Sequence, residues 1–391
     1  MGFQPPSNAY LSEEDLSKAE ITYPLRINVC TKCWLVQTED YVNETDFFSP
    51  EYAYFSSTST TWLNHAKQFC DSITQRLHLD KKSMVIEVAS NDGYLLKNFV
   101  KKGIPCLGIE PTESTAKVSE RMNIPTMKKF FGDKLAQELI SDGYKADLVI
   151  GNNVFAHVPD INDFTSGIHT VLKPEGVVTL EFPHLMRLVE FNQFDTVYHE
   201  HFSYFSLHTV KEVFQHHNLR LFDVEKLSTH GGSIRVYGCR MESSKQPSNR
   251  VDELLKEEKL RGMQAEKYYK GFQNVADMIK NELLEFLIEK KKEGKIVAAY
   301  GAAAKGNTLL NYAGVKPDLI PFVCDAAEAK QGRYLPGSHI PILSPAKLKT
   351  AEIDYLIILP WNIASEIKQQ NQFLTEKGVK FVTFIPELNI L

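Results

Sequence analysis

The chain has 391 residues, of which 43% are hydrophobic and 24% charged, and its formal net charge is −5 at pH 7. A single hydrophobic core stops growing at about 250–300 residues, so we expect two or three domains. The acidic balance excludes a broad basic surface for nucleic acid, no apolar stretch approaches the ~20 residues of a membrane span, and the N-terminus lacks a signal-peptide pattern. We therefore predict a cytoplasmic protein that binds neither nucleic acid nor a membrane.

Residues 1–58 are predicted to form an N-terminal segment of short, turn-rich pieces. Cys30 and Cys33 have the C-x-x-C spacing, with apolar residues on both sides. That spacing suits half of a tetrahedral zinc site, but the chain shows no matching second pair. The alternative is a pair of ordinary thiols, which is how we interpret the four other, scattered cysteines.

Residues 59–245 are predicted to form a first α/β domain. A helix is expected over residues 60–79, and a second at Leu207–His217. The expected strands are Ser83–Ala89, Pro105–Glu110, Ala146–Gly151, Gly176–Phe182, Leu221–Lys226 and Gly232–Arg240. Strands that alternate with helices indicate a parallel sheet covered on both faces.

The turn after the first of these strands lacks the G-x-G-x-x-G pattern of a dinucleotide site. It has an acid on the strand, small residues at the bend and one glycine at the helix start: Glu87, Ser90, Asn91, Asp92 and Gly93. A turn with acidic residues suits a cationic, phosphate-free ligand such as S-adenosylmethionine (SAM). Glu110 ends the next strand, about 20 residues on, where a carboxylate accepts ribose hydroxyls. The alternative is a generic turn with a solvent-facing Glu110.

Two later features favour a methyl-donor site. Asn152, Asn153 and His157 follow the strand at Ala146–Gly151, at the sheet edge where such folds bind ligands. A Lys-Pro-x-Gly turn at residues 173–176 then leads into the next strand, which is typical of class I SAM-dependent methyltransferases.

Residues 246–292 are charged and helical and are predicted to connect two domains. Residues 293–391 are predicted to form a second, Rossmann-like domain, with strands at Lys295–Tyr300, Ile320–Asp325, Tyr355–Leu359 and Val379–Phe384. Gly301 and Ala302 lie in a small-residue turn that opens a helix, where backbone amides can meet a phosphate, and Lys305 adds charge. Lys330 and Arg333 are expected to complete a diphosphate site. The alternative is a tight turn without a ligand.

The run from Tyr198 to Phe202 contains a phenol, two imidazoles and a carboxylate within four positions. Such groups abstract protons, polarise carbonyls or bind metals. A patch of titratable surface residues is the alternative. A metal site made by His199, Glu200 and His201 is not expected, because adjacent residues do not easily converge on one ion.

Together these motifs make the chain similar to the nucleotide-sugar C-methyltransferases, which act on TDP-4-keto-deoxysugars. The resemblance covers nearly the whole chain. Its motifs are Pro24-Leu25, Cys30-x-x-Cys33, the run from Tyr52 to Ser57, Asn91-Asp92-Gly93, Asn153-x-x-x-His157, Tyr198-x-Glu200-His201, His230-Gly231-Gly232-Ser233, the turn from Tyr300 to Gly306, and Lys330-Gln331-Gly332-Arg333. That family typically has a further C-x-x-C before the position of Met1, so the zinc site here is expected to be incomplete.

The resemblance implies a mechanism and roles for these residues. His201 would be the general base that forms an enolate beside the sugar ketone, with Glu200 orienting or tuning its imidazole. Tyr198 and Tyr54 would donate hydrogen bonds to the enolate oxygen, although both tyrosines also suit simple packing. His157, Asn153 and His230 would contact substrate, with a capping or core role as the alternative for His157; His199 is taken as structural. The implied methyl donor is SAM, and the implied assembly is a monomer.

Three other functions are compatible with parts of the sequence. An O- or N-methyltransferase needs less carbon-acid activation than the cluster at residues 198–201 supplies. An NAD-dependent nucleotide-sugar oxidoreductase would use the turn at Gly301, which lacks the full dinucleotide pattern. A nucleotide-sugar-binding regulator with an inactive transferase domain is the non-enzymatic alternative.

Overall fold

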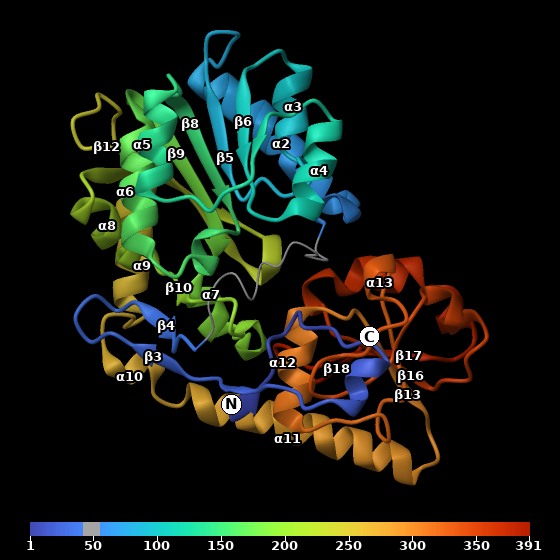
Figure 1. Cartoon of the computed structure of the whole chain (residues 1–391). Coiled ribbons are helices and arrows are strands. Elements are labelled where there is room, and N and C mark those ends of the chain that lie inside the picture. Colours follow the sequence, from blue (N-terminus) through green and yellow to red (C-terminus); the bar gives the residue numbers. More distant parts are fainter. Residues whose placement is uncertain (42–54) are drawn as a thin grey trace.

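The computed structural model describes residues 1–41 and 55–391. Two α/β units lie one above the other in Figure 1, and the long helix α11 (Phe272–Lys292) runs along the lower edge of the molecule. The remaining helices are α2 (Thr60–Leu77), α3 (Leu96–Lys101), α4 (Glu113–Arg121), α5 (Asp133–Ser141), α6 (Ile161–Val171), α7 (Leu185–Glu190), α8 (Leu207–His216), α9 (Asn249–Leu260), α10 (Glu266–Tyr269), α12 (Ala304–Ala313), α13 (Ala364–Gln370) and α14 (Phe373–Glu376).

The first unit is built on a seven-stranded sheet of order β11-β12-β9-β8-β5-β6-β7. The strands are β5 (Val85–Val88), β6 (Cys106–Ile109), β7 (Thr126–Met127), β8 (Ala146–Asn152), β9 (Leu172–Pro183), β11 (Leu219–Leu227) and β12 (Ser233–Arg240). The five strands from β5 to β9 are parallel, and β12 is antiparallel to both of its neighbours. The strand order reverses between β5 and β8, so the carboxyl ends of these two strands are where this fold binds ligands.

Local sequence explains helix α2, which covers one face of this sheet. Its N-cap is Ser59, whose side chain accepts a hydrogen bond from the Trp62 amide, and it ends at His78 in the left-handed conformation. Its buried residues, Ala66, Phe69, Cys70 and Ile73, recur at helical spacing. The helix therefore presents one apolar face to the sheet.

The Lys-Pro-x-Gly segment does not form the separate turn that the sequence predicts. Residues 172–176 belong to β9, and the pairing with β8 passes from Ala146–Leu172 to Leu148–Val177. Residues 173–176 of β9 thus stand opposite the single residue Asp147 of β8. The backbone of Gly176 lies close to the Ala146 carbonyl oxygen, 2.7 Å from where a Cβ would stand. The segment is an irregularity within a strand rather than a separate turn.

The second unit has a six-stranded sheet of order β15-β14-β13-β16-β17-β18. Its strands are β13 (Val297–Tyr300), β14 (Val323–Cys324), β15 (Ile342–Leu343), β16 (Tyr355–Ile358), β17 (Lys380–Thr383) and β18 (Asn389–Ile390), all parallel except β18. The order reverses between β13 and β16, which gives this sheet its own ligand-binding edge. Helix α11 contributes Ala276, Ile279, Leu283, Phe286 and Leu287 to this core, so part of the connector packs with the second unit.

The N-terminal residues contact both units. Strands β1 (Phe3–Gln4) and β2 (Tyr23–Pro24) form a small ribbon, and β3 (Ile27–Val29) pairs with β4 (Val36–Thr38). Strand β4 also pairs with β10 (Ser203–Tyr204) of the first unit, while Leu11 bridges to Tyr334 of the second. This segment therefore holds the two units together at the level of residues 198–204.

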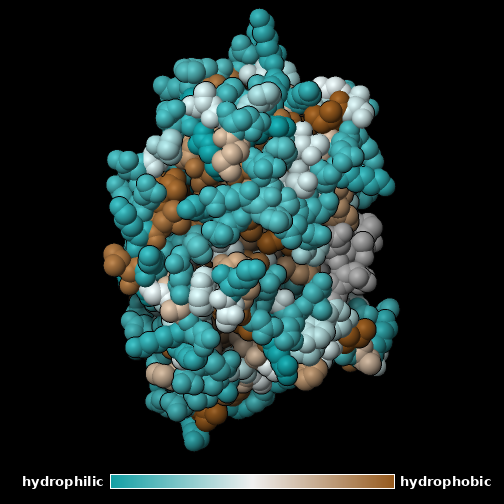
Figure 2. Space-filling model, turned by 90° about the vertical axis from the view of Figure 1, so that its left-hand side faces the viewer, coloured by the Kyte–Doolittle hydropathy of each residue, from teal (hydrophilic) through white to brown (hydrophobic). Residues whose placement is uncertain are grey.

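Within residues 1–41 and 55–391, none of the helices is long and apolar enough to cross a membrane. The face shown in Figure 2 is mostly hydrophilic, with hydrophobic side chains in small separate groups. Scattered exposed apolar residues of this kind are normal and mark no binding surface.

Candidate active site

Buried polar atoms gather at the carboxyl ends of β5 and β8. Glu87 Oε2, Ser90 Oγ, Asp92 Oδ1 and both amide atoms of Asn152 are buried and have no hydrogen-bond partner among the described residues. Such groups are nearly always paired in folded proteins, so their convergence at the switch point indicates a polar ligand. Burial, reinforced by Asp92 and Glu110, raises the pKa of Glu87 well above its usual value. A cationic ligand group would relieve that cost.

Glu110 is buried at the end of β6, so the solvent-facing alternative is wrong. One carboxylate oxygen accepts a hydrogen bond from the Asn91 amide at 2.9 Å, and the other accepts one from the Thr112 amide at 3.0 Å. The Thr112 hydroxyl also donates to the second oxygen, so the oxygen that binds the Asn91 amide is the one that keeps a lone pair for a ribose hydroxyl. Gly93 has φ +76°, and a Cβ there would lie 2.6 Å from Ile124, so the turn requires glycine.

His201 lies at the centre of a second cluster, on the loop between the 3₁₀ turn Phe194–Thr196 and β10. Its Nδ1 lies 2.9 Å from the Thr196 carbonyl oxygen, and its Nε2 lies 2.7 Å from the Tyr198 hydroxyl. A carbonyl only accepts, so Nδ1 carries the proton and Nε2 is the basic nitrogen. Burial, together with His157 and Lys305, lowers the pKa of His201 well below its usual value.

Glu200 differs from its predicted role. Its carboxylate accepts hydrogen bonds from the Ser7 hydroxyl at 3.1 Å and from the Asn8 amide at 3.1 Å, and it makes no contact with the His201 ring. The Thr196 carbonyl orients that ring instead. Glu200 acts through its backbone carbonyl, which accepts a hydrogen bond from His157 Nδ1 at 2.7 Å. Residues 198–201 form a turn closed by a hydrogen bond from the His201 amide to the Tyr198 carbonyl at 3.0 Å, and the adjacent side chains of Glu200 and His201 have different partners.

His157 is packed edge-on against His201, with ring centroids 4.6 Å apart. Burial lowers the pKa of His157 to about 4, so both imidazoles are neutral at pH 7. His199 instead lies beside the N-terminal segment, with Nε2 3.2 Å from the Pro24 carbonyl oxygen, as a structural residue would. Tyr54, the other predicted hydrogen-bond donor, lies outside the described residues.

The turn after β13 repeats the geometry of the turn after β5. The Ala302 amide donates to Asp325 Oδ2 at 2.7 Å, as the Asn91 amide does to Glu110. Gly301 has φ +95°, and a Cβ there would lie 2.3 Å from the Pro360 side chain. The two glycine-containing turns thus each bind the acid that ends the neighbouring strand.

Of the three basic residues predicted for the diphosphate site, two lie at the turn and one lies at the surface. Lys305 is half-buried, with Nζ 3.2 Å from Asn362 Oδ1 and 4.6 Å from the ring centroid of Trp361. Lys330 donates to the Ala302 carbonyl at 2.7 Å, beside the turn. Arg333 is exposed. The structure therefore brings Lys305 and Lys330 to the turn and leaves Arg333 at the surface.

The two units meet at these residues. Trp361, which follows β16, donates its indole N–H to Asp195 Oδ2 at 2.7 Å, and Thr308 on α12 donates to the Val197 carbonyl at 3.0 Å. Asp195 is buried, which raises its pKa to about 6. The loop that carries His201 is therefore held directly by the second unit, and Lys305 lowers the pKa of both His201 and His230.

Cys30 and Cys33 lie at the turn between β3 and β4 as free, half-buried thiols. Among the described residues no group of three or more His, Cys, Asp or Glu side chains can hold a metal ion. The pair has the spacing of two of the four ligands of a tetrahedral zinc site, and the described residues place no further such ligands with it.

The chain is similar to a known protein over its whole length. A curated protein, the C-methyltransferase NovU of Streptomyces niveus, is 34% identical over 390 residues, covering 100% of this chain and 93% of the relative. The chain belongs to the C-methyltransferase family. Three family models match it: a putative zinc binding domain at residues 1–48, a methyltransferase domain at 62–224 and a C-methyltransferase C-terminal domain at 228–386.

Several solved methyltransferase structures are similar to part of the chain. A putative sarcosine dimethylglycine methyltransferase from Galdieria sulphuraria is 12% identical, with a TM-score of 0.38 over 46% of this chain and 87% of that chain. A magnesium protoporphyrin IX methyltransferase from Synechocystis with bound SAM is 15% identical, with a TM-score of 0.35 over 46% of this chain and 81% of that chain. These scores are low, and the class I SAM-methyltransferase assignment comes from the family models and the strand order.

Membership of the family excludes O- and N-methylation and the oxidoreductase alternative, and the enzyme is a SAM-dependent C-methyltransferase. Sequence reasoning missed several residues that shape its site. Thr196, Asp195 and Trp361 lie on loops at the interface, and Ser7 and Asn8 lie far away in the chain. Trp361 was predictable, because it lies three residues after the end of a parallel strand, at the carboxyl edge of its sheet.

Proposed function

We propose that this C-methyltransferase methylates a carbon next to the ketone of a nucleotide-linked 4-keto-deoxysugar, with His201 as the base that forms the enolate. The observation that carries the proposal is the fixed tautomer of His201. Its Nδ1–H is held by the Thr196 carbonyl, so the lone pair of Nε2 faces Tyr198 between the methyl-donor edge and the second unit. A neutral imidazole with a defined basic nitrogen is what removal of a C–H proton requires.

The methyl-donor side of the site fits SAM. The unpaired polar atoms of Glu87, Ser90, Asp92 and Asn152 would hold the cationic amino-acid part, and Glu110 would accept a ribose hydroxyl. Bound SAM supplies an electrophilic methyl group. The protein's task is then to generate a carbon nucleophile in line with that group and away from water.

Tyr198 has a role at each stage of this chemistry. In the structure its hydroxyl donates to His201 Nε2. When the acidic C–H of the sugar takes that position, the proton passes to Nε2 and the electron pair of the C–H bond moves onto the ketone as an enolate. The released Tyr198 hydroxyl then donates to the enolate oxygen. The enolate carbon would then be the nucleophile for the methyl group that bound SAM supplies, and the imidazolium would return its proton to solvent.

The nucleotide part would occupy the second unit. The turn at Gly301 and Ala302 lies at the N-terminus of α12, where backbone amides and the helix dipole favour a phosphate. Lys305 and Lys330 lie beside this turn, and Lys305 also faces the histidines of the first unit. A diphosphate anchored there would present its sugar to His201 across the interface.

Solvent deuterium exchange into a TDP-4-keto-6-deoxysugar, with SAM omitted, tests the proposal. We expect the wild-type enzyme to exchange hydrogen at carbon 3 or carbon 5, which NMR would resolve. His201→Gln should lose exchange and methyl transfer by about 10²–10⁴-fold, the usual contribution of a general base, while still binding SAM. Full exchange in that variant would remove His201 as the base. Binding of the sugar without any exchange, followed by methylation of another substrate, would overturn the substrate class.

A further inference from the structure

Two residues with unusual backbone conformations meet at the edge of the methyltransferase sheet. Asn153 has φ 54° and His230 has φ 52°, both in the left-handed region that non-glycine residues rarely adopt. Their side chains are in contact, with Asn153 Nδ2 3.2 Å from His230 Nε2, although 77 residues separate them in the chain. Strained residues that persist in pairs are held by their surroundings and cluster at functional sites.

The contact defines the tautomer of His230. The amide nitrogen of Asn153 donates to Nε2, so the proton of the neutral ring lies on Nδ1. Burial, with Lys305 adding to it, lowers the pKa of His230 to about 4, and the ring is therefore uncharged at pH 7. Its edge packs against Trp62, with centroids 5.3 Å apart. His230 is thus a neutral donor whose Nδ1–H is not used by the contact with Asn153.

One residue is bonded to both loops. The backbone carbonyl of Glu181, on β9, accepts a hydrogen bond from the Asn153 amide at 2.7 Å. Its side-chain Oε1 accepts one from the Thr229 hydroxyl at 3.1 Å, directly before His230. Glu181 therefore fixes the backbone at one loop and the neighbouring residue at the other.

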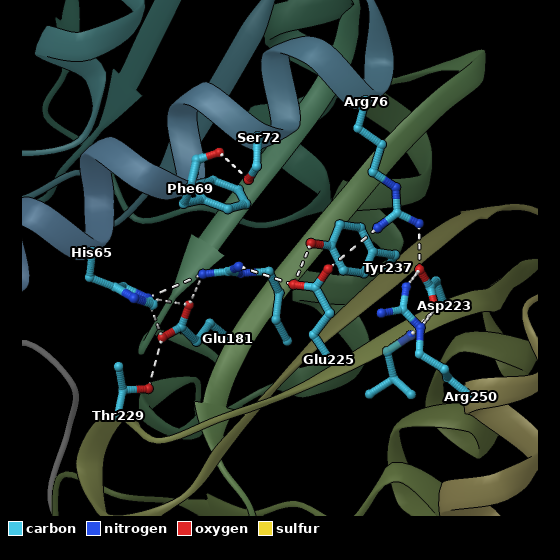
Figure 3. Close-up of polar contacts among 12 residues, drawn as sticks. His65, Phe69, Ser72, Arg76, Glu181, Asp223, Glu225, Thr229, Tyr237 and Arg250 are labelled. Atoms are coloured by element: carbon cyan, nitrogen blue, oxygen red, sulfur yellow. Dashed lines mark hydrogen bonds and ion pairs between the residues drawn. The ribbon is translucent and has the colours of Figure 1, made fainter.

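The carboxylate of Glu181 has several polar partners, as Figure 3 shows. It is fully buried, with His65 Nε2 2.9 Å from Oε1 and Arg235 Nη2 2.5 Å from Oε2. Burial alone would raise the pKa of Glu181, but His65 and Arg235 outweigh that effect and lower it. The ring of His65 stacks on Trp62, which also contacts His230. Helix α2 therefore supports Glu181 through His65 and His230 through Trp62.

We propose that Glu181 is a positioning residue for methyl transfer, which holds Asn153 and His230 as a pair and so presents the Nδ1–H of His230 to an oxygen of the substrate. The proposal rests on the function proposed above for the nature of that substrate. A buried cluster of charged side chains of this kind contributes little to the net free energy of folding. We therefore assign to Glu181 the orientation of Asn153 and His230. Glu181 touches neither reacting group, and its effect passes through Thr229 and the Asn153 backbone.

Paired variants separate positioning from general stability. Thr229→Val removes the hydroxyl with nearly the same shape, while Thr229→Ser keeps it. Thr229→Val and Glu181→Gln should lower kcat by about 10²-fold, the scale of a small misplacement, with the Kd for SAM unchanged. Thr229→Ser should keep most of the wild-type kcat. Glu225→Gln is the matched control, because it removes a carboxylate bonded to the same Arg235 but not to Thr229; its kcat should stay at the wild-type value.

A second readout needs no sugar substrate. The ¹⁵N shifts of the His230 ring, assigned by their loss in His230→Gln, should show a single Nδ1-protonated tautomer in the wild type and a mixture of tautomers in Thr229→Val. Unchanged tautomer and unchanged kcat in Thr229→Val would overturn the proposal, as would an equal loss of kcat in Glu225→Gln. If the tautomer shifts as expected but the wild type does not methylate nucleotide-linked ketosugars, the proposed function fails while the positioning role stands.

Discussion

His201 has different partners on its two ring nitrogens, and this difference decides what the residue can do. The Thr196 carbonyl occupies the protonated Nδ1, and the Tyr198 hydroxyl occupies the basic Nε2. The neighbouring His157 is oriented in the same way, through Nδ1 to the Glu200 carbonyl. Two backbone carbonyls thus set both tautomers, and no carboxylate is needed beside either ring.

The pH dependence of methyl transfer should reflect this environment. Because burial, His157 and Lys305 keep the pKa of His201 well below its usual value, Nε2 stays unprotonated as the pH falls through 6.5. We therefore expect kcat/KM, which reports groups of the free enzyme, to show no loss from protonation of the base between about pH 8 and pH 6. Measuring kcat/KM over this pH range checks the prediction. An acidic limb with an apparent pKa near 6.5, absent when the SAM-binding step is measured alone, would contradict the assignment.

Among the secondary-structure elements, the two turns that follow the central strands matter most. In each, a backbone amide donates to the acid at the end of the neighbouring strand, Glu110 in the first unit and Asp325 in the second. The first turn faces unpaired buried polar atoms, whereas the second faces Lys305 and Lys330. In the proposed function, the same backbone arrangement would therefore bind a cationic ligand in the first unit and an anionic one in the second.

Replacing Gly301 by alanine tests how tightly the second turn is built. Its φ of +95° disfavours any side chain, and the added Cβ would lie 2.3 Å from the Pro360 ring. We expect Gly301→Ala to lower the free energy of unfolding by more than the about 1–2 kcal/mol that a left-handed alanine costs. Gly314→Ala is the control, since Gly314 has φ +67° with no atom within 4 Å. Urea unfolding of both variants measures the difference, and equal losses would contradict the close packing.

On the scale of the whole molecule, the active site is assembled from three parts of the chain. The N-terminal segment holds Glu200 through Ser7, and the second unit holds the adjacent loop through Thr308 and Trp361. These contacts bury several titratable groups between the units. The stability of the folded protein should therefore depend on pH through residues of the proposed active site.

His157 gives the sharpest test of that dependence. Its pKa is about 4 when folded and about 6.5 when unfolded, so the unfolded chain binds a proton first and stability falls as the pH drops from about 6.5 to about 4. The slope for this one group is about 1.4 kcal/mol per pH unit. Asp195, with its pKa raised to about 6, acts in the opposite direction, so the wild-type slope alone does not isolate either residue.

Comparing the wild type with His157→Gln isolates the contribution of His157 to the pH dependence of stability. Between pH 6 and pH 5 the free energy of unfolding of the wild type should decline more steeply than that of the variant, by up to about 1.4 kcal/mol per pH unit. Urea unfolding at several pH values provides both slopes. Parallel slopes would mean that His157 is as easily protonated in the folded protein as in the unfolded chain.

The sequence by itself determined the two α/β units, the turn at residues 90–93, the acid at Glu110 and the family. Those features are local: strand periodicity, turn chemistry and short motif spacing act over a few residues, so the chain displays them directly. Only the tertiary structure decided that Glu200 binds Ser7, that Tyr198 pairs with His201, and that Glu181 joins Asn153 to Thr229. Most of these contacts join segments far apart in the chain, and hydrogen-bond direction, which sets each tautomer, has no counterpart in a one-dimensional pattern.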